Sequence, residues 1–178
     1  MASRFDGSFQ VFRIASAAHP VFDGGGAHRW GSRWCTPGRR VIHASSAYSL
    51  ALLENLVHWN SAWLPPEMRY VVATIPQEVS RAILDAEALP DWDRPDLGIS
   101  RPLGDAWYDE AAAAVLVVPS VLLPFEPNVL INQDHPDIGR VEVSAERPVA
   151  LDRRLARQRR PAIWTPRNAV PRRRFTPP

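Results

Sequence analysis

The stretch that most constrains the fold is residues 45–59, SSAYSLALLENLVHW, which contains neither glycine nor proline. The rest of the chain is rich in both, because the 178 residues include 18 prolines and 9 glycines. About four uninterrupted turns with leucines on more than one side predict a helix, and Ser45 or Ser46 can cap its first turn. We expect this helix to be central to the domain.

Short segments rich in β-branched and aromatic residues predict strands around the helix. These segments are residues 9–15, 41–44, 69–75, 115–118, 129–132, 140–144 and 148–151. Residues 85–104 carry prolines and glycines among acids and predict a loop, after which Asp105 is expected to cap a short helix over 105–114. Because strands and helices do not alternate regularly, we expect an α+β fold with mixed short strands.

Length and composition predict one compact domain. A chain of 178 residues that is 46% hydrophobic can bury one core but is too short for two. The first residues lack an apolar leader, and the longest apolar run, 111–118, is far shorter than the roughly 20 residues that span a bilayer. We therefore expect a cytoplasmic protein without membrane contact. Cys35 is the single cysteine, and the five histidines lack metal-ligand spacing, so we expect no metal.

The charges are distributed unevenly along the chain. Residues 156–178 contain seven arginines, five prolines and no acidic residue, whereas residues 1–155 contain 14 arginines against 19 acids, a formal charge of −5. We expect residues 1–155 to form the domain and residues 156–178 to form an irregular basic tail. The tail can contact nucleic acid or an acidic partner, or it can lie against its own acidic domain, and both interpretations stay open.

Two loop sequences carry side chains suited to ligand binding. In GSRWCTPG, residues 31–38, Arg33 and Trp34 lie between two glycines, so a guanidinium that can grip phosphate stands beside an indole that can cover a flat ring. An ordinary surface turn is the alternative. In residues 115–132, Ser120 follows a proline between two apolar segments, where its hydroxyl can serve a ligand or bond a neighbouring backbone group.

The predicted helix carries a third candidate site. Ala47, Ala51, Glu54 and His58 recur on one stripe, so a carboxylate and an imidazole share a face lined by small residues. An exposed Glu–His pair, worth only a few tenths of a kcal/mol, is the alternative interpretation.

Several motifs occur together in one order along the chain: VFRI, GSRWCTPG, VIHASSAYSLALLENLVH, DAWYDE, VPSVLLPFEPNVLINQDHPD and PVALDRRL. This series, over about residues 9–155, closely resembles the RES domain, the toxin of a bacterial type II toxin–antitoxin class. The family takes its name from an Arg, a Glu and a Ser, which by motif position are Arg33, Glu54 and Ser120. The chain departs from the family at two places. His43 stands where the family usually has tyrosine, and residues 31–35 are GSRWC where the family usually has GGRWN. The histidine adds a group expected to titrate near neutral pH.

The resemblance implies a fold similar to mono-ADP-ribosyltransferase toxins, and NAD as a substrate cut at its nicotinamide–ribose bond. The nicotinamide ring is cationic in NAD and leaves as a neutral molecule, so it needs no general acid. Positive charge develops on the ribose instead, and an anion near the ribose favours it, which is the role implied for Glu54. Arg33 and Arg13 would hold the pyrophosphate. His58 would either activate the acceptor or orient Glu54. The groups implied to hold the nicotinamide are Trp34, Tyr48 or His43, and Ser120.

The acceptor of ADP-ribose stays open. Water or phosphate would make the protein an NAD glycohydrolase or phosphorylase, and a protein target, such as an enzyme of nucleotide metabolism, would make it an ADP-ribosyltransferase. The resemblance also implies a helix-turn-helix antitoxin that covers the active site, makes the DNA contacts and prevents growth arrest by the free toxin. The alternative is a non-catalytic binding module whose basic tail engages nucleic acid or an acidic partner. The acidic body argues against that alternative.

Overall fold

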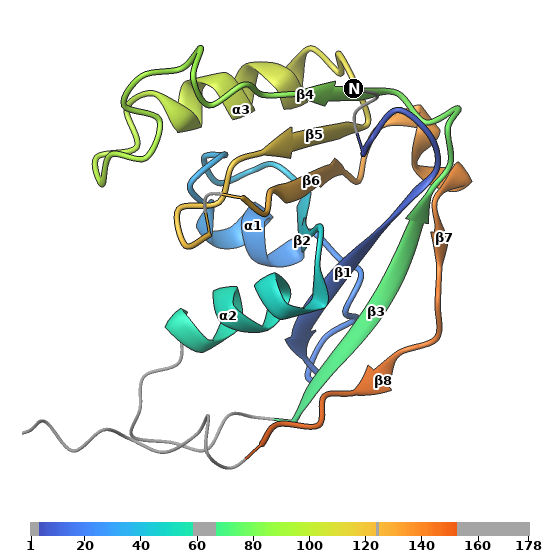
Figure 1. The fold of residues 1–178 in the computed structure, drawn as a ribbon. Helices are drawn as coiled ribbons and strands as arrows, with labels where there is room; N and C mark the ends of the chain where they lie inside the picture. The colour runs from blue at the N-terminus through green and yellow to red at the C-terminus, as the bar shows by residue number, and fades with distance from the viewer. Residues whose placement is uncertain (1–3, 59–66, 124, 153–178) are drawn as a thin grey trace, which may run out of the picture.

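The computed structural model describes residues 4–58, 67–123 and 125–152 (Figure 1). The predicted tail, 156–178, lies outside these residues, as does Trp59 at the end of the predicted helix. The strands are β1 (Phe9–Ser16), β2 (Val41–Ser45), β3 (Met68–Ile75), β4 (Arg81–Ile83), β5 (Val115–Val118), β6 (Asn128–Asn132), β7 (Glu142–Val143) and β8 (Arg147–Pro148). The helices are α1 (Gly25–Trp30), α2 (Tyr48–His58), α3 (Ser100–Asp109) and the short 3-10 helix η1 (Pro136–Arg140).

The strands form one mixed sheet in the order β4–β5–β6–β2–β1–β3–β7, and β8 also pairs with β3. The pair β4–β5 is parallel and the other pairs are antiparallel. Figure 1 shows α3 near β4 and β5 at one end of the molecule, and α2 beside β1 and β2 further along the sheet. The predicted α+β class is therefore confirmed.

Both faces of the sheet are covered at β5, and this explains its uninterrupted apolar sequence, VLVV. Successive side chains of a strand point to opposite faces. Val115 and Val117 accordingly join a cluster with Ile42, Ile75 and Ile131. Their neighbours in the sequence enter a second cluster, whose members include Trp34, Trp107, Leu116, Val118 and Leu130. The second cluster attaches α3 and the segment around Trp34 to the sheet.

The central helix is shorter at its start than the predicted 45–59. Ser45 is the last residue of β2, and α2 begins at Tyr48. The predicted capping role is wrong for both serines, because the Ser45 hydroxyl bonds Asn128 and the buried Ser46 hydroxyl has no hydrogen-bond partner among the described residues. Pairing of β2 with β6 extends through Ser45 and outweighs the local signal for a cap.

The region predicted as loop 85–104 and helix 105–114 also differs. Helix α3 starts at Ser100 and ends at Asp109, so Asp105 lies within the helix and does not cap it. Pro102 is tolerated because amides of the first turn have no intrahelical acceptor. Helix α1 and strand β4 were not predicted, since one begins with glycines and the other is only 3 residues long and relies on pairing with β5.

Candidate active site

A pocket of about 820 Å³ lies among α2, β1, β2, the segment 31–34 and the turn after β5. This volume is toward the upper end of ordinary small-molecule sites. Most of the predicted site residues line it, namely Arg13, Arg33, Trp34, His43 and Glu54. Ser120 is adjacent, between the lining residues Pro119 and Val121. The structure thus brings together groups that are far apart in the sequence.

Glu54 is held from one side by two hydrogen bonds to the same oxygen. Its Oε1 accepts from the Ser120 hydroxyl at 3.0 Å and from the Asn128 side-chain amide at 2.6 Å. Among the described residues no hydrogen bond reaches Oε2, so this oxygen is available to a ligand. Glu54 is therefore an oriented carboxylate in a pocket, and the interpretation as an exposed surface pair does not describe it.

Ser120 has its hydrogen-bonding capacity filled. Besides donating to Glu54, its oxygen accepts from the backbone amides of Leu122 at 3.1 Å and Leu123 at 3.3 Å. A serine hydroxyl offers one donor and two acceptor positions. With the side chain buried at 4% exposure, Ser120 is placed to orient Glu54 and its own turn.

The sheet register produces this arrangement. In the antiparallel pairs, Asn128 lies directly across from Ser45 on β2 and from Val118 on β5. All three are at the same edge of the sheet, where β2 and β5 end and β6 begins. Helix α2 follows β2 after a short bend, so its second turn carries Glu54 over this edge. We call Ser45, Glu54, Ser120 and Asn128 the carboxylate side of the pocket.

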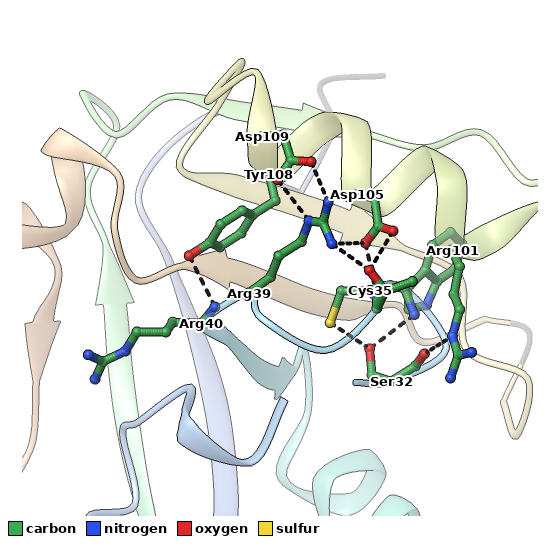
Figure 2. A network of polar contacts seen from close by, with 10 residues as sticks. Ser32, Cys35, Arg39, Arg40, Arg101, Asp105, Tyr108 and Asp109 are labelled. Carbon is green, nitrogen blue, oxygen red and sulfur yellow. Dashed lines mark hydrogen bonds and ion pairs between the residues drawn. The ribbon is translucent and has the colours of Figure 1, made fainter. Parts of the chain in front are cut away.

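Arg33 belongs to a different structure, residues 31–40, which we call the arginine loop. Helix α3 holds this loop with a network of polar contacts (Figure 2). Asp105 accepts from the Thr36 amide at 2.8 Å and from the Thr36 hydroxyl at 2.9 Å, and Arg101 donates to the Ser32 carbonyl at 2.9 Å. Arg39 pairs with Asp105 at 3.2 Å and also with Asp109. The loop is thereby attached to α3 at both ends.

The close approach of α3 to the arginine loop requires a glycine. A Cβ added to Gly104 would lie 1.8 Å from the Trp34 carbonyl oxygen. Trp34 itself is 4% exposed, and its indole stacks on Trp92 with ring centroids 5.8 Å apart. Little of this ring is open to a ligand, although Trp34 lines the pocket. Among the described residues, Arg33 donates one hydrogen bond, to the Arg94 carbonyl at 3.1 Å.

Arg13 and His43 are neighbours in the pocket wall. Arg13 donates to the carbonyls of Val21, Asp23 and His43, which commits three of its five N–H groups to the backbone. Burial lowers the pKa of Arg13 to about 10, so the guanidinium stays charged at neutral pH. Burial, and next the charge of Arg13, lower the pKa of His43 to about 4. The expectation that His43 titrates near neutral pH is therefore wrong.

Two further candidates are not placed in the pocket. Tyr48 is absent from its lining and packs edge-on against Phe12 and Tyr70. His58 ends α2, but its side chain lies outside the described part of the chain. The described residues contain no group of three or more His, Cys, Asp or Glu that could hold a metal ion, and metal independence stays a prediction.

The sequence analysis missed Asn128 and Ser45 on the carboxylate side, and Arg101, Gly104 and Asp105 behind the arginine loop. The signal for Asn128 was a polar residue at the first position of a strand, NVLIN, whose next three residues are apolar. Arg101 and Gly104 had no such signal, because their segment was assigned to a loop, and Asp105 was predicted only as the cap of a helix.

Comparison with known proteins identifies the family. Residues 10–153 match the family described as the RES domain. The chain belongs to the RES domain family. The predicted resemblance is thereby confirmed over nearly the whole proposed domain.

Two curated RES relatives are toxins by name. The Prs ADP-ribosylating toxin of Sphingobium sp. (strain YBL2) is 37% identical over 155 residues, covering 83% of this chain and 96% of that protein. Toxin Res of Photorhabdus laumondii is 31% identical over 143 residues, covering 79% of this chain and 91% of that protein.

A solved structure shares the RES fold seen here. In the Mycobacterium tuberculosis MbcT–MbcA toxin–antitoxin complex, a chain superposes with a TM-score of 0.66 at 16% identity, covering 80% of this chain and 84% of that one. At this identity the likeness concerns the fold alone. In the part of the chain that is described, no helix has the length and apolar character needed to cross a membrane.

Proposed function

We propose that this RES-domain protein is a toxin that cleaves the nicotinamide–ribose bond of NAD and transfers ADP-ribose to a protein target, or to water or phosphate. The observation that carries the proposal is the oriented carboxylate of Glu54, with Oε2 unengaged by the described residues, in one pocket with the guanidinium of Arg33. The name of one curated relative, the Prs ADP-ribosylating toxin, supports ADP-ribose transfer, and the name Toxin Res supports the role as a toxin.

Glu54 would act on the ribose. When the C–N bond breaks, its electron pair goes to the nicotinamide ring, which leaves neutral, and positive charge develops on the ribose carbon. A preorganised anion next to that carbon lowers the barrier, and no proton donor is needed for the leaving group. The acceptor then attacks the ribose carbon. Water or a protein side chain releases its proton to solvent, whereas an anionic phosphate oxygen attacks without losing one. The structure supports Glu54 for this role because its carboxylate is already fixed before substrate arrives.

The arginines would bind the pyrophosphate. Arg33 has one N–H on the Arg94 carbonyl, so its fork retains donors for a bidentate contact with phosphate oxygens. Arg13 is more constrained, since two of its N–H groups remain after its backbone contacts. We assign Arg33 the direct grip on the pyrophosphate, and Arg13 a fixed positive charge in the wall with at most a secondary contact.

The pocket surroundings support a macromolecular partner. Val57 on α2 and Val121 after β5 line the pocket with exposures of 62% and 50%, and Phe125 on the same turn is 95% exposed. Exposed apolar side chains around a site are typical of a surface that binds another protein. We propose that an antitoxin of the helix-turn-helix class covers this surface in the cytoplasm, makes the DNA contacts and blocks the growth arrest. Residues 1–155 would suffice for the reaction, with 156–178 as a tail.

The test incubates the full-length chain with NAD labelled in its adenylate half, with and without cell lysate. Wild type is compared with Glu54→Gln, and Glu142→Gln on the exposed strand β7 is the matched control. We expect the Glu54 variant to lose at least about 100-fold in rate and the control to keep its rate.

Each product identifies one acceptor. Free ADP-ribose or its phosphate formed without lysate indicates hydrolysis or phosphorolysis. Label joined to one lysate protein, only with Glu54 intact, indicates a transferase and identifies the target. Intact NAD in every sample would overturn the proposed function and favour the binding module.

A further inference from the structure

We infer that Asn128, held in one orientation by Ser45, is a positioning residue that sets the orientation of the Glu54 carboxylate, so that one oxygen is held by hydrogen bonds and the other is left for the substrate. The inference concerns the catalytic carboxylate and rests on the proposed function. It assigns a task to two residues that the sequence analysis did not place in the site.

Ser45, Asn128 and Glu54 form a chain of two hydrogen bonds that begins in the sheet, and we call this chain the relay. The Ser45 hydroxyl donates to Asn128 Oδ1 at 2.8 Å, and Asn128 Nδ2 donates to Glu54 Oε1 at 2.6 Å. Ser45 is 4% exposed, so water does not compete readily for its hydroxyl. Because Ser45 and Asn128 are directly opposed residues of β2 and β6, the register keeps the first contact in place.

The relay fixes the direction of the amide. If the Asn128 amide were rotated by half a turn, Oδ1 would face Oε1 of Glu54, and two acceptors would meet at hydrogen-bond distance. With Oδ1 turned to Ser45, both amide ends are satisfied, since the hydroxyl supplies a proton and the carboxylate receives one. Ser45 therefore acts through Asn128 and does not touch Glu54.

The direction of the Asn128 amide in turn determines the orientation of the Glu54 carboxylate. Oε1 receives hydrogen bonds from Asn128 on β6 and from Ser120 in the turn after β5. One bond would let the carboxylate swing about the side chain, whereas two donors from separate elements fix its plane. The second oxygen, Oε2, is then the one left to interact with the ribose. A displacement of about 1 Å at a catalytic group can cost about 100-fold in rate.

The test compares kcat and KM for NAD consumption by full-length Asn128→Asp, Asn128→Ala and Ser45→Ala. Asn128→Asp keeps the shape but replaces the donor with an acceptor beside Oε1, so it should lower kcat about 100-fold, at least as far as Asn128→Ala. Ser45→Ala should lower kcat by less, about tenfold, because Glu54 still favours the native amide direction. KM should change less than about threefold in all three variants, since the pyrophosphate grip is elsewhere.

Asn132→Asp is the matched control. This residue is on the same strand and is 2% exposed, and its amide donates to the Tyr108 carbonyl away from Glu54. Its kcat should equal that of wild type. A merely structural role for Asn128 predicts the opposite order, with the isosteric Asn128→Asp more active than Asn128→Ala, and that result would overturn the inference.

A second measurement does not require turnover. Nitrogen–proton NMR spectra of the full-length chain record the Asn128 side-chain amide, whose proton should shift on Glu54→Gln and on Ser45→Ala. An unchanged amide resonance in both variants would overturn the relay. If wild type consumes no NAD while these shifts occur, the proposed function fails and the relay stands, so the two failures are distinguishable.

Discussion

The carboxylate side and the arginine loop are held in place by different interactions. Glu54 depends on hydrogen bonds with Ser120 and Asn128, which the sheet register delivers to one edge. Arg33 depends on a loop that α3 holds from outside the sheet (Figure 2). The difference matches the proposed roles, in which Glu54, the group proposed to stabilise charge, is held by the sheet, and Arg33, the group proposed to bind phosphate, is on a loop held by α3.

The contacts that hold the arginine loop differ in strength. Arg39 and Asp109 form an ion pair in which the aspartate side chain is 53% exposed, and such pairs contribute at most about 1 kcal/mol. The Asp105 side chain is 19% exposed and binds the loop backbone as well as Arg39. The arginine loop is therefore held mainly by Asp105 and by the close packing at Gly104, and much less by its outer ion pair.

The largest expected effect follows from removing that close packing. In Gly104→Ala the new methyl group meets the Trp34 carbonyl oxygen 1.8 Å away, so α3 and the arginine loop must separate. We expect the free energy of unfolding to fall by at least about 3 kcal/mol and KM for NAD to rise in the remaining folded protein. Urea unfolding followed by circular dichroism measures the first effect.

Gly26→Ala in α1 is the matched control, because a Cβ there meets nothing within 4 Å. It should change stability by less than about 1 kcal/mol, in the stabilising direction. If Gly104→Ala were as stable as this control, the arginine loop would not depend on its approach to α3.

A smaller effect, on the pH dependence of stability, comes from His43, which is in the pocket wall and belongs neither to the carboxylate side nor to the arginine loop. In the unfolded chain this histidine gains a proton below about pH 6.5, whereas its pKa in the folded protein is about 4. The unfolded state therefore binds more protons between these values, and stability must fall as the pH is lowered through that window. The loss amounts to up to about 3 kcal/mol and levels off below about pH 4.

His43→Gln should remove this part of the pH dependence, and the exposed His19→Gln should retain it. Urea unfolding at a series of pH values between 4 and 7 measures the difference. Equal slopes for wild type and His43→Gln would show that the buried imidazole is not the origin, and would leave the charged groups around the arginine loop to explain the pH dependence.

The sequence predicted the elements whose signals are local. Strand β5 was predicted at residues 115–118 because a short apolar run between turns is typical of a buried strand. Helix α2 was predicted because no glycine or proline interrupts its sequence. The starts of α2 and α3 were not predicted correctly, because they depend on contacts between distant segments. These contacts are the pairing of Ser45 with Asn128 and the packing of Gly104 on Trp34.

The candidate site divides in the same way. Motif position and helix spacing singled out Arg33, Glu54 and Ser120. No spacing rule could show that Asn128 meets Glu54, since that contact needs the β2–β6 register and the placement of α2 together. Nor could it show that the Ser120 hydroxyl is already filled by contacts within the protein.

The most direct test of the proposed roles of Glu54 and Arg33 is calorimetric titration of NAD into the full-length Glu54→Gln protein, which should bind NAD without consuming it. The double variant Glu54→Gln/Arg33→Gln is the matched comparison. We predict saturable binding of one NAD by the single variant, and affinity at least about tenfold weaker in the double variant, the loss expected when a charged hydrogen-bond partner is removed. Equal affinity in the two proteins, or no binding by the single variant, would contradict the assignment of binding to the arginine loop and of chemistry to the carboxylate side.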